Sequence, residues 1–370
     1  MRESHEAAGA VFGDIHGMSV PRHYGNPAGE YQAAVTGIAV ADRSHRTRLY
    51  ISGKAPAQML QGLLSGRIPV SPLTEDSIER VRWEYSLVLT PKGRIISDLR
   101  ATRLGGTTEA FLLDVPAAGA PALGEHLKRS LPPRLASTDD RSRVSGMLTV
   151  MGPESAGFLS REALGLRVEE VDLVSLEEGE GVRVPDGDDL GVIVVRNAEV
   201  ATPAFDVVAD SSTVSALWRR LVETGASPAG HGVFQTLRVE AGRPAFGIDL
   251  DEKTIPFEAG LVDRAVDHEK GCYTGQEVIV RIRDRGHVNR HLRGLVIGEG
   301  VSLRLGAELF DVEGGKPVGV ITSVAQSPRA SGTLALGYVR REVDVPGSVR
   351  LNAPDGFTVE VRELGEGWAF

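Results

Sequence analysis

The sequence contains a single cysteine, Cys272, among its 370 residues, and only 5% of the residues are aromatic. One thiol excludes an intramolecular disulfide. It also excludes a zinc or iron–sulfur site built from this chain's thiolates alone, because such sites need about four ligands. No apolar run approaches the roughly 18 residues of a membrane span. Residues 1–20 carry acidic side chains and lack the apolar core of a signal peptide. We therefore expect a soluble, cytoplasmic protein that does not contact a membrane.

The chain also lacks several motifs that mark common enzyme classes. The P-loop, the dinucleotide motif G-x-G-x-x-G, H-E-x-x-H and G-x-S-x-G are all missing, which disfavours nucleotide-dependent, zinc-protease and α/β-hydrolase activities. With 41 Lys and Arg against 50 Asp and Glu, the net charge is −9. Direct binding of nucleic acid is disfavoured, because it requires a broadly basic surface.

The first two-thirds of the chain contain an internal repeat. Leu49–Leu60 and Leu148–Leu159 each read as a short strand, a glycine and the first turns of a helix. A hairpin-like stretch and an amphipathic helix follow each of them. Short strand–glycine–helix units are common, so four matching positions also fit a coincidence. Because order and spacing both recur, the simpler interpretation is two related α+β units.

Beyond about Arg293 the pattern changes to alternating or continuous apolar runs without a helical period. Gly314–Gly315 and Asp355–Gly356 lie between such runs, which is typical of hairpins. We expect a small β-barrel or sandwich there. The sequence therefore predicts an α+β fold in three parts: a first α+β unit over 1–142, a second over 143–290 and a C-terminal β-barrel over 291–370.

The segment Lys270–Arg285 carries the most informative chemistry. Thr274 is followed three residues later by Glu277, just before an apolar run, and this is the signature of a capping box. The pattern predicts a helix that begins at Thr274. It therefore places Cys272 and Tyr273 directly before a helix N-terminus.

Such a position favours a reactive thiolate at Cys272. The unpaired N–H groups of the helix start and the nearby Lys270 both stabilise negative charge. Gly271 and Gly275 allow a ligand to approach the backbone closely. The alternative interpretation is that a lone cysteine is a small buried hydrophobic residue.

The stretch from Lys270 to Arg293 is basic, with a net charge of +4 that leaves −13 for the rest of the chain. Such a strip suits an anionic ligand or partner, such as a carboxylate tail, a phosphate or RNA. It also fits a solvated face that pairs with acidic residues elsewhere. His287 and His291 are expected in a turn and a strand, so no metal site is predicted.

The octapeptide K-G-C-Y-T-G-Q-E at Lys270–Glu277, followed by Arg281, resembles the signature of the YgfZ-type folate-binding proteins. These are relatives of the glycine-cleavage T-protein, an aminomethyltransferase. Further stretches resemble the pattern of the wider superfamily: His23–Gly25, Val40–His45, Thr236–Pro244 and Pro256–Leu261.

The resemblance implies a three-lobed, cloverleaf-like molecule with tetrahydrofolate in a central hole and a C-terminal β-barrel. In the T-protein a G-x-x-x-D-D segment supplies two aspartates. The matching residues Gly93–Asp98 hold Ser97 and retain only Asp98. Glu240 matches a glutamate that contacts the pterin. The folate-binding residues implied in this chain are Asp98, Glu240, Gly271, Tyr273, Gly275, Gln276, Glu277 and Arg281.

The resemblance further implies an accessory protein that supports assembly or maintenance of iron–sulfur clusters in client enzymes, including tRNA-modifying ones. Cys272 and Lys270 are then the reactive residues. One thiolate provides a single cluster ligand or reacts transiently, and the iron–sulfur client or assembly protein provides the other ligands. The alternative is a tetrahydrofolate-dependent aminomethyltransferase or another one-carbon transferase, which Ser97 disfavours. An RNA-binding module is a third possibility.

Overall fold

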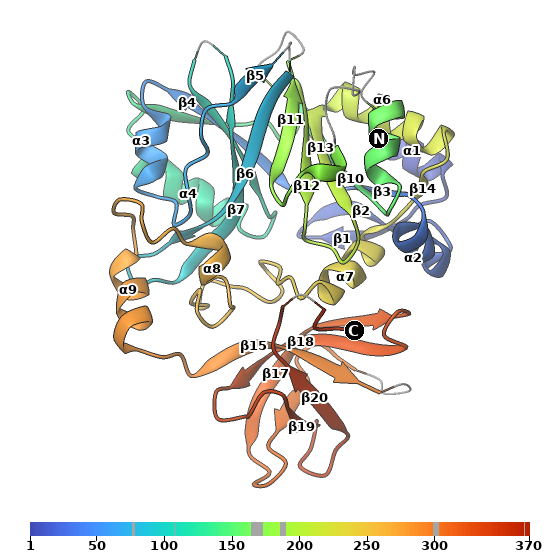
Figure 1. Cartoon of the computed structure of the whole chain (residues 1–370), viewed down its shortest axis with the longest axis vertical. Helices are drawn as coiled ribbons and strands as arrows, with labels where there is room; N and C mark the ends of the chain where they lie inside the picture. Colours follow the sequence, from blue (N-terminus) through green and yellow to red (C-terminus); the bar gives the residue numbers. More distant parts are fainter. Residues whose placement is uncertain (76–77, 107, 164–172, 186–189, 299–302, 366) are drawn as a thin grey trace.

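The molecule has three lobes, two of α+β type that share one sheet and a third that is a closed barrel (Figure 1). This is a computed structural model that describes residues 1–370 except 76–77, 107, 164–172, 186–189, 299–302 and 366. The predicted α+β class, with two related units and a C-terminal barrel, is confirmed. The sandwich alternative for the C-terminal part is wrong.

The chain up to residue 142 supplies short helices and most of one half of the large sheet. Its elements are α1 (Arg2–Ala7), β1 (Val11–Ile15), β2 (Met18–His23), α2 (Pro27–Thr36), β3 (Ala39–Asp42), β4 (Thr47–Gly53), α3 (Pro56–Gln61), β5 (Leu73–Glu75), β6 (Ile78–Leu89), β7 (Ile95–Leu104), β8 (Ala110–Val115), α4 (Ala120–Ser130) and β9 (Ala136–Asp140).

The next part repeats the order found from β4 to β9, without a counterpart of β5, and then continues into irregular chain and short helices. Its elements are β10 (Ser145–Met151), α5 (Ser155–Phe158), a π-helical turn (Leu159–Ala163), a 3-10 turn (Leu173–Ser175), β11 (Glu180–Val184), β12 (Val192–Asn197), β13 (Ala204–Asp210), α6 (Ser211–Glu223), β14 (Ser227–Pro228), α7 (His231–Glu240), α8 (Val262–Ala265) and α9 (Gln276–Arg285).

The last part forms the barrel, closed in the order β15-β18-β17-β16-β19-β20. Closure leaves no free sheet edge. Its strands are β15 (Arg290–Ile297), β16 (Glu308–Phe310), β17 (Pro317–Ser327), β18 (Gly332–Arg340), β19 (Gly347–Leu351) and β20 (Thr358–Arg362).

The predicted repeat is visible at the ends of β4 and β10. Gly53 is the last residue of β4 and Gly152 directly follows β10, and each precedes a helix, with φ angles of +149° and +121°. A Cβ atom at Gly53 would clash with the carbonyl oxygen of Leu135, and one at Gly152 with that of Gly37. Only glycine accepts both the positive φ angle and the lack of space for a Cβ atom. The glycine therefore recurs in the two units for a structural reason.

One twelve-stranded sheet joins the two units, with the order β14-β3-β10-β13-β12-β11-β6-β7-β8-β4-β9 and β5 beside β6. The strand β3 pairs with β10, so the sheet crosses the predicted boundary at residue 142. The boundaries at 142 and 290 stay predictions.

Each unit packs one amphipathic helix against the sheet. The helix α4 buries Leu123 and Leu127, and α6 buries Leu217, Trp218 and Leu221. Burying a side chain of this kind contributes about 1.5–3 kcal/mol. No helix within the described residues is long and apolar enough to cross a bilayer. The predicted cytoplasmic location stays a prediction.

Buried ion pairs tie the two units together. Arg100 on β7 donates to Asp114 on β8, and at 2.7 Å to Asp206 on β13. Arg46 donates to the same Asp114 at 2.8 Å. Removing one partner of such a buried pair costs about 3–5 kcal/mol. This network fixes the floor of the pocket described next.

Candidate functional site

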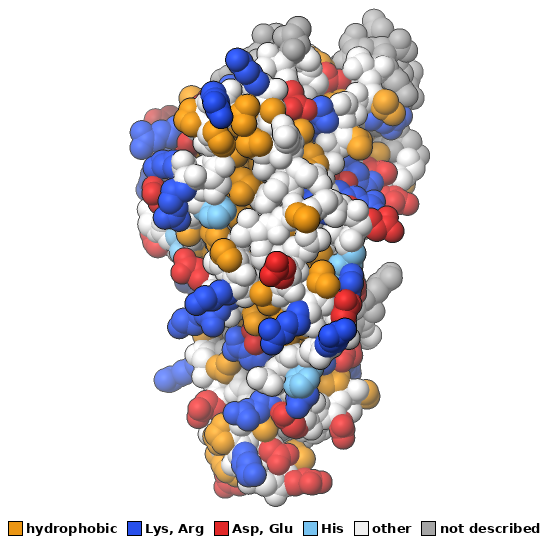
Figure 2. Space-filling view, turned by 90° about the vertical axis from the view of Figure 1, so that its left-hand side faces the viewer, with side chains coloured by type: hydrophobic (Ala, Val, Ile, Leu, Met, Phe, Trp, Pro, Cys, Tyr) orange, Lys and Arg blue, Asp and Glu red, His pale blue; other side chains and the backbone are white. Residues whose placement is uncertain are grey.

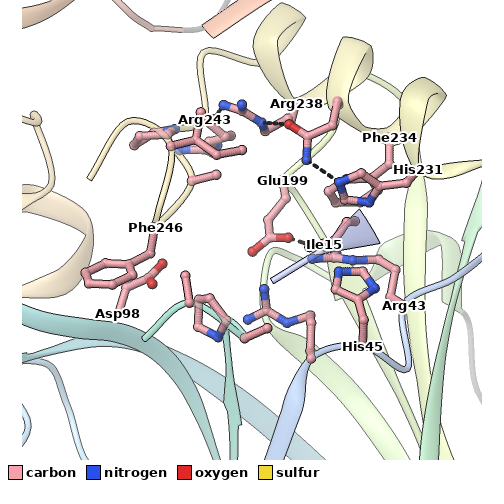
Figure 3. Close-up of a pocket in the computed structure, with 18 of the residues that line it drawn as sticks. Ile15, Arg43, His45, Asp98, Glu199, His231, Phe234, Arg238, Arg243 and Phe246 are labelled. Atoms are coloured by element: carbon pink, nitrogen blue, oxygen red, sulfur yellow. Dashed lines mark hydrogen bonds and ion pairs between the residues drawn. The ribbon is translucent and has the colours of Figure 1, made fainter. Parts of the chain in front are cut away.

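A deep pocket opens where the two units meet α7 and the following loop (Figure 3). It holds about 760 Å³ of empty space, including its open mouth. Asp98 and Phe246 lie at one end, Arg43 and two histidines at the other, with Glu199 between them. The residues used below line this space: Arg43, His45, Arg46, Tyr85, Asp98, Glu199, His231, Phe234, Gln235, Arg238, Arg243, Phe246 and Arg264.

Asp98 is a buried carboxyl on β7. The Tyr85 hydroxyl on the neighbouring strand β6 donates to its Oδ2 atom at 2.9 Å. Its Oδ1 atom is buried and has no hydrogen-bond partner among the described residues. Burial raises the pKa of Asp98 above its ordinary value, because a carboxylate loses hydration there. Asp98 therefore holds a proton more readily than an exposed aspartate.

Glu199 is the second carboxyl of the pocket and behaves in the opposite way. It accepts from Arg43 at 3.0 Å and lies 3.6 Å from Arg100. Burial opposes its ionisation, but Arg100, Arg43 and other guanidinium groups outweigh this and hold the pKa of Glu199 well below its ordinary value. Two carboxyl groups whose pKa values are shifted in opposite directions within one pocket suit different roles in proton transfer.

Arginines supply most of the charge of this pocket. Five of them line it. Arg43 stacks on Phe234, with 3.8 Å from its guanidinium carbon to the ring centroid. Arg243 and Arg264 both pair with Glu178. With more arginines than acids, the pocket favours an anionic ligand.

Two histidines form an uncharged wall. The rings of His45 and His231 meet edge to face, with centroids 5.3 Å apart. Burial, and next the positive charges of Arg43 and Arg238, lower the pKa of His231 to about 3. Burial and the neighbouring His231 and Arg43 hold the pKa of His45 well below its ordinary value. Both rings are therefore neutral at pH 7.

Comparisons with known proteins identify this architecture. The family described as GCVT N-terminal domain matches residues 1–270, and the glycine cleavage T-protein C-terminal barrel domain matches residues 290–363. The aminomethyltransferase of Rubrobacter xylanophilus is 31% identical, with 98% of this chain and 89% of that protein covered. The aminomethyltransferase of Corynebacterium jeikeium is 30% identical, with 98% and 93% covered.

The chain belongs to the glycine cleavage T-protein family.

A solved structure agrees with this assignment at the level of fold. The glycine cleavage system aminomethyltransferase T from Bartonella henselae superposes with a TM-score of 0.81 at 23% identity, covering 99% of this chain and 96% of that one. Aminomethyltransferases of this family use tetrahydrofolate as the one-carbon carrier, so the predicted cofactor is confirmed.

The predicted main function, an accessory role in iron–sulfur cluster assembly through Cys272, is wrong by the same comparisons. Relatives that match almost the whole chain are named aminomethyltransferase. They favour the alternative of a one-carbon transferase. Ser97 had argued against it, yet the single remaining acid, Asp98, occupies the pocket of this T-protein family member.

The structure separates the two carboxyls predicted to contact folate. Asp98 lines the pocket, whereas Glu240 at the end of α7 does not. Glu240 Oε1 accepts from the Tyr31 hydroxyl and from Ser327 Oγ, both at 2.7 Å. Glu240 lines a neighbouring cavity, next to the loop that carries Arg243. Its predicted contact with the pterin stays a prediction.

The cysteine motif lies elsewhere on the molecule. Gly271 and Cys272 are exposed, and so are Glu277 and Arg281, while Tyr273 is buried and Gln276 half-buried. None of the residues from Lys270 to Arg281 lines the pocket of Asp98. The structure therefore does not bring the two groups of predicted site residues together, and the predicted roles of this segment stay predictions.

The predicted capping box is wrong. The helix α9 begins at Gln276, and its N-cap is Gly275 in the left-handed region at φ +88°, without a side-chain capping bond. Thr274 instead donates its backbone N–H to the carbonyl of Gly62 at 3.1 Å. Contacts with the first unit therefore override the local capping pattern. Cys272 lies in the loop three residues before the N-cap.

Lys270 anchors this loop. Its ammonium donates to the carbonyl oxygens of Leu64 at 2.6 Å and Gly66 at 2.9 Å. Burial lowers the pKa of Lys270 to about 8. Of the basic strip, Arg281, Arg283 and Arg285 are exposed, and Figure 2 shows Lys and Arg side chains on the face that carries α9. Arg290 and Arg293 pair with Glu258 and Glu363.

Sequence reasoning missed most of the pocket. Arg43 and His45 lie in the stretch Val40–His45, which resembles the superfamily pattern but does not by itself indicate a role for either side chain. Glu199 and His231 carried no signal, because neither belongs to a recognised motif. They reach the pocket from the loop after β12 and from the first turn of α7.

Proposed function

We propose that this chain is a tetrahydrofolate-dependent aminomethyltransferase. Support comes from family membership and from the relatives of that name that align over nearly the whole chain. One structural observation supports the proposal from this chain's own residues. The pocket pairs a buried carboxyl whose pKa is raised, Asp98, with one whose pKa is held well below its ordinary value, Glu199, inside an arginine-rich wall.

The residues present fit a folate. Four polar atoms of the pocket are buried without a hydrogen-bond partner among the described residues: Asp98 Oδ1, Arg43 Nε, His45 Nδ1 and His231 Nδ1. Buried polar atoms are normally paired, so a ligand rich in both donors and acceptors suits them. A pterin ring has N–H groups for a carboxylate and acceptor atoms for an arginine or an imidazole. The arginines of the rim suit the carboxylates of the glutamate tail.

When bound, tetrahydrofolate supplies the secondary amine that accepts the one-carbon unit. The chain's own residues bind, orient and handle protons. Tyr85 occupies Asp98 Oδ2, which leaves Oδ1 as the oxygen able to hold or release a proton. Glu199 stays ionised and offsets the charge of Arg43 and Arg100. The neutral histidines add polar contacts without adding charge.

The direct test measures binding and turnover with matched variants. Titration calorimetry should show saturable binding of tetrahydrofolate. Release of ammonia and methylenetetrahydrofolate from an aminomethylated carrier protein should follow. Asp98→Asn should lower kcat by about a hundredfold or more, as expected for loss of a proton-transfer group. Asp355→Asn, in an exposed turn of the barrel, is the control and should change neither quantity.

Two outcomes would contradict the proposal. One is the absence of saturable tetrahydrofolate binding at millimolar ligand. The other is binding without any methylenetetrahydrofolate formed from the carrier substrate, which would leave a folate-binding protein that is not an aminomethyltransferase.

We infer that this chain belongs to a YgfZ-type subgroup of the family. Its support is the octapeptide Lys270–Glu277 and the exposure of Cys272. This assignment makes no claim on the reaction in the pocket, because the octapeptide lies outside it.

A further inference from the structure

A series of buried and half-buried hydrogen bonds runs from the C-terminal barrel to the wall of the pocket. On β17, Ser323 Oγ donates to Asp249 Oδ1 at 2.6 Å and accepts from Arg238 Nη2 at 2.7 Å. Arg238 Nη1 also donates to Asp249 Oδ2 at 2.6 Å. Its Nε atom donates to Gln235 Oε1 at 2.6 Å. The Gln235 amide nitrogen lies 2.8 Å from His231 Nε2, and Figure 3 draws the last two of these contacts.

The donors and acceptors in this series of hydrogen bonds determine which ring nitrogen of His231 carries the proton. An arginine has no acceptor, so the oxygen of Gln235 must face Arg238 and its NH2 group must face His231. An amide nitrogen only donates, so Nε2 of His231 accepts. The proton of the neutral ring therefore sits on Nδ1. A second proton on Nε2 would point at a donor, so the same contact also keeps the ring neutral.

The Nδ1 atom of His231 is buried and has no partner among the residues that the structure describes. The same holds for Nδ1 of His45, whose ring stands edge-on to it. His231 and Gln235 line the pocket of Asp98 and also a second cavity beside β2 and α2. A ligand that enters the pocket is thus the acceptor available to the unpaired N–H group.

We propose that the barrel positions His231, through Ser323, Arg238 and Gln235, as the Nδ1–H tautomer, which donates a hydrogen bond to the ligand of the pocket. Ser323, Arg238 and Gln235 are positioning residues, because they act through His231. The contact with tetrahydrofolate rests on the proposed function. The tautomer rests only on the hydrogen bonds above.

Nitrogen NMR of the histidine rings in the full-length protein at pH 7.5 reads the tautomer directly. The chain has 9 histidines, and His231→Gln identifies the signal of interest by its loss. We expect His231 to show a protonated Nδ1 and a bare Nε2. A bare Nδ1, or two protonated nitrogens, at the signal so identified would overturn the proposal.

Gln235→Glu tests the positioning step. A carboxylate accepts where the amide donated, so the proton should move to Nε2 of His231. Ser323→Ala, in the barrel, should loosen Arg238 and leave His231 as a mixture of both tautomers. Gln32→Glu, at an exposed position on α2, is the matched control and should leave the spectrum unchanged. If Gln235→Glu folds and keeps the wild-type tautomer, Gln235 does not set the tautomer of His231 and the proposed positioning is wrong.

Titration with tetrahydrofolate tests the ligand contact. The Nδ1 signal of His231 should shift on binding, and His231→Phe should raise Kd by about tenfold, the size of one lost hydrogen bond. Binding without any change at His231 overturns the contact. If no tetrahydrofolate binds while the Nδ1–H tautomer is present, the proposed function fails and the positioning stands. If it binds while Nε2 carries the proton, the positioning alone fails.

Discussion

The Tyr85 hydroxyl donates a 2.9 Å hydrogen bond to Asp98 Oδ2 across the neighbouring strands β6 and β7. This contact orients the carboxyl and leaves Oδ1 as its unpartnered oxygen among the described residues. The aromatic ring of Tyr85 is covered in turn by Arg264, at 4.5 Å from the ring centroid. The arrangement anchors one oxygen of the carboxyl group and leaves the other without a partner among the described residues.

Tyr85→Phe should shift the pH dependence of turnover to higher pH. The hydrogen bond from Tyr85 lowers the pKa of Asp98 and partly offsets the effect of burial, so its loss should raise that pKa further. The pH profile of kcat measures this shift. Denaturant unfolding should show a loss of about 1 kcal/mol, the usual value of one hydrogen bond. An unchanged profile would exclude Asp98 as the group that limits turnover.

Acid should destabilise the protein through His231. The folded-state pKa of about 3 lies below the ordinary value of 6.5. The resulting stability is therefore fully present above pH 6.5 and is lost as pH falls towards 3. Between pH 7 and pH 4, the wild type should lose about 3 kcal/mol more of its free energy of unfolding than His231→Gln does.

Urea unfolding at the two pH values gives this difference. Equal losses in wild type and variant would mean that His231 titrates normally in the folded state. His126→Gln is a suitable control, because that side chain is only partly buried on α4.

Gly152→Ala should destabilise the second unit strongly. Gly152 has a φ of +121°, and an added Cβ would clash with the carbonyl of Gly37. We expect a loss of about 3 kcal/mol or more, from backbone strain together with the clash. Gly225→Ala is matched in backbone, with φ +118°, but its added Cβ meets no described atom within 4 Å. Its smaller loss isolates the backbone cost. Equal losses would show that the clash relaxes freely.

Cys272→Ser should leave tetrahydrofolate affinity and aminomethyl transfer unchanged. The thiol is exposed and lies outside the pocket of Asp98, so the substitution removes no contact there. Calorimetry and the carrier-protein assay measure both quantities. A tenfold loss in either one would tie the cysteine segment to the reaction in the pocket.

Local sequence pattern was enough to predict the parts of the fold that rest on short stretches of chain. Alternating and continuous apolar runs predicted a β-barrel or sandwich, and the strand–glycine–helix repeat predicted two related units. The repeat was readable because Gly53 and Gly152 meet the same backbone demand at the same place. Asp98 was implied by the resemblance of Gly93–Asp98 to the T-protein segment and not by local pattern.

The composition of the pocket depends on contacts between residues that are far apart in the sequence. Arg43 meets Glu199 across 156 residues of chain, and His231 joins them from a third element. No local period records such a meeting, because it depends on how the sheet curls and where α7 packs. The capping pattern at Thr274 failed for the same reason, since contacts of that loop with the first unit moved the helix start. Local patterns report which face of a segment is buried. The pocket depends on which buried faces come together, and long-range packing decides that.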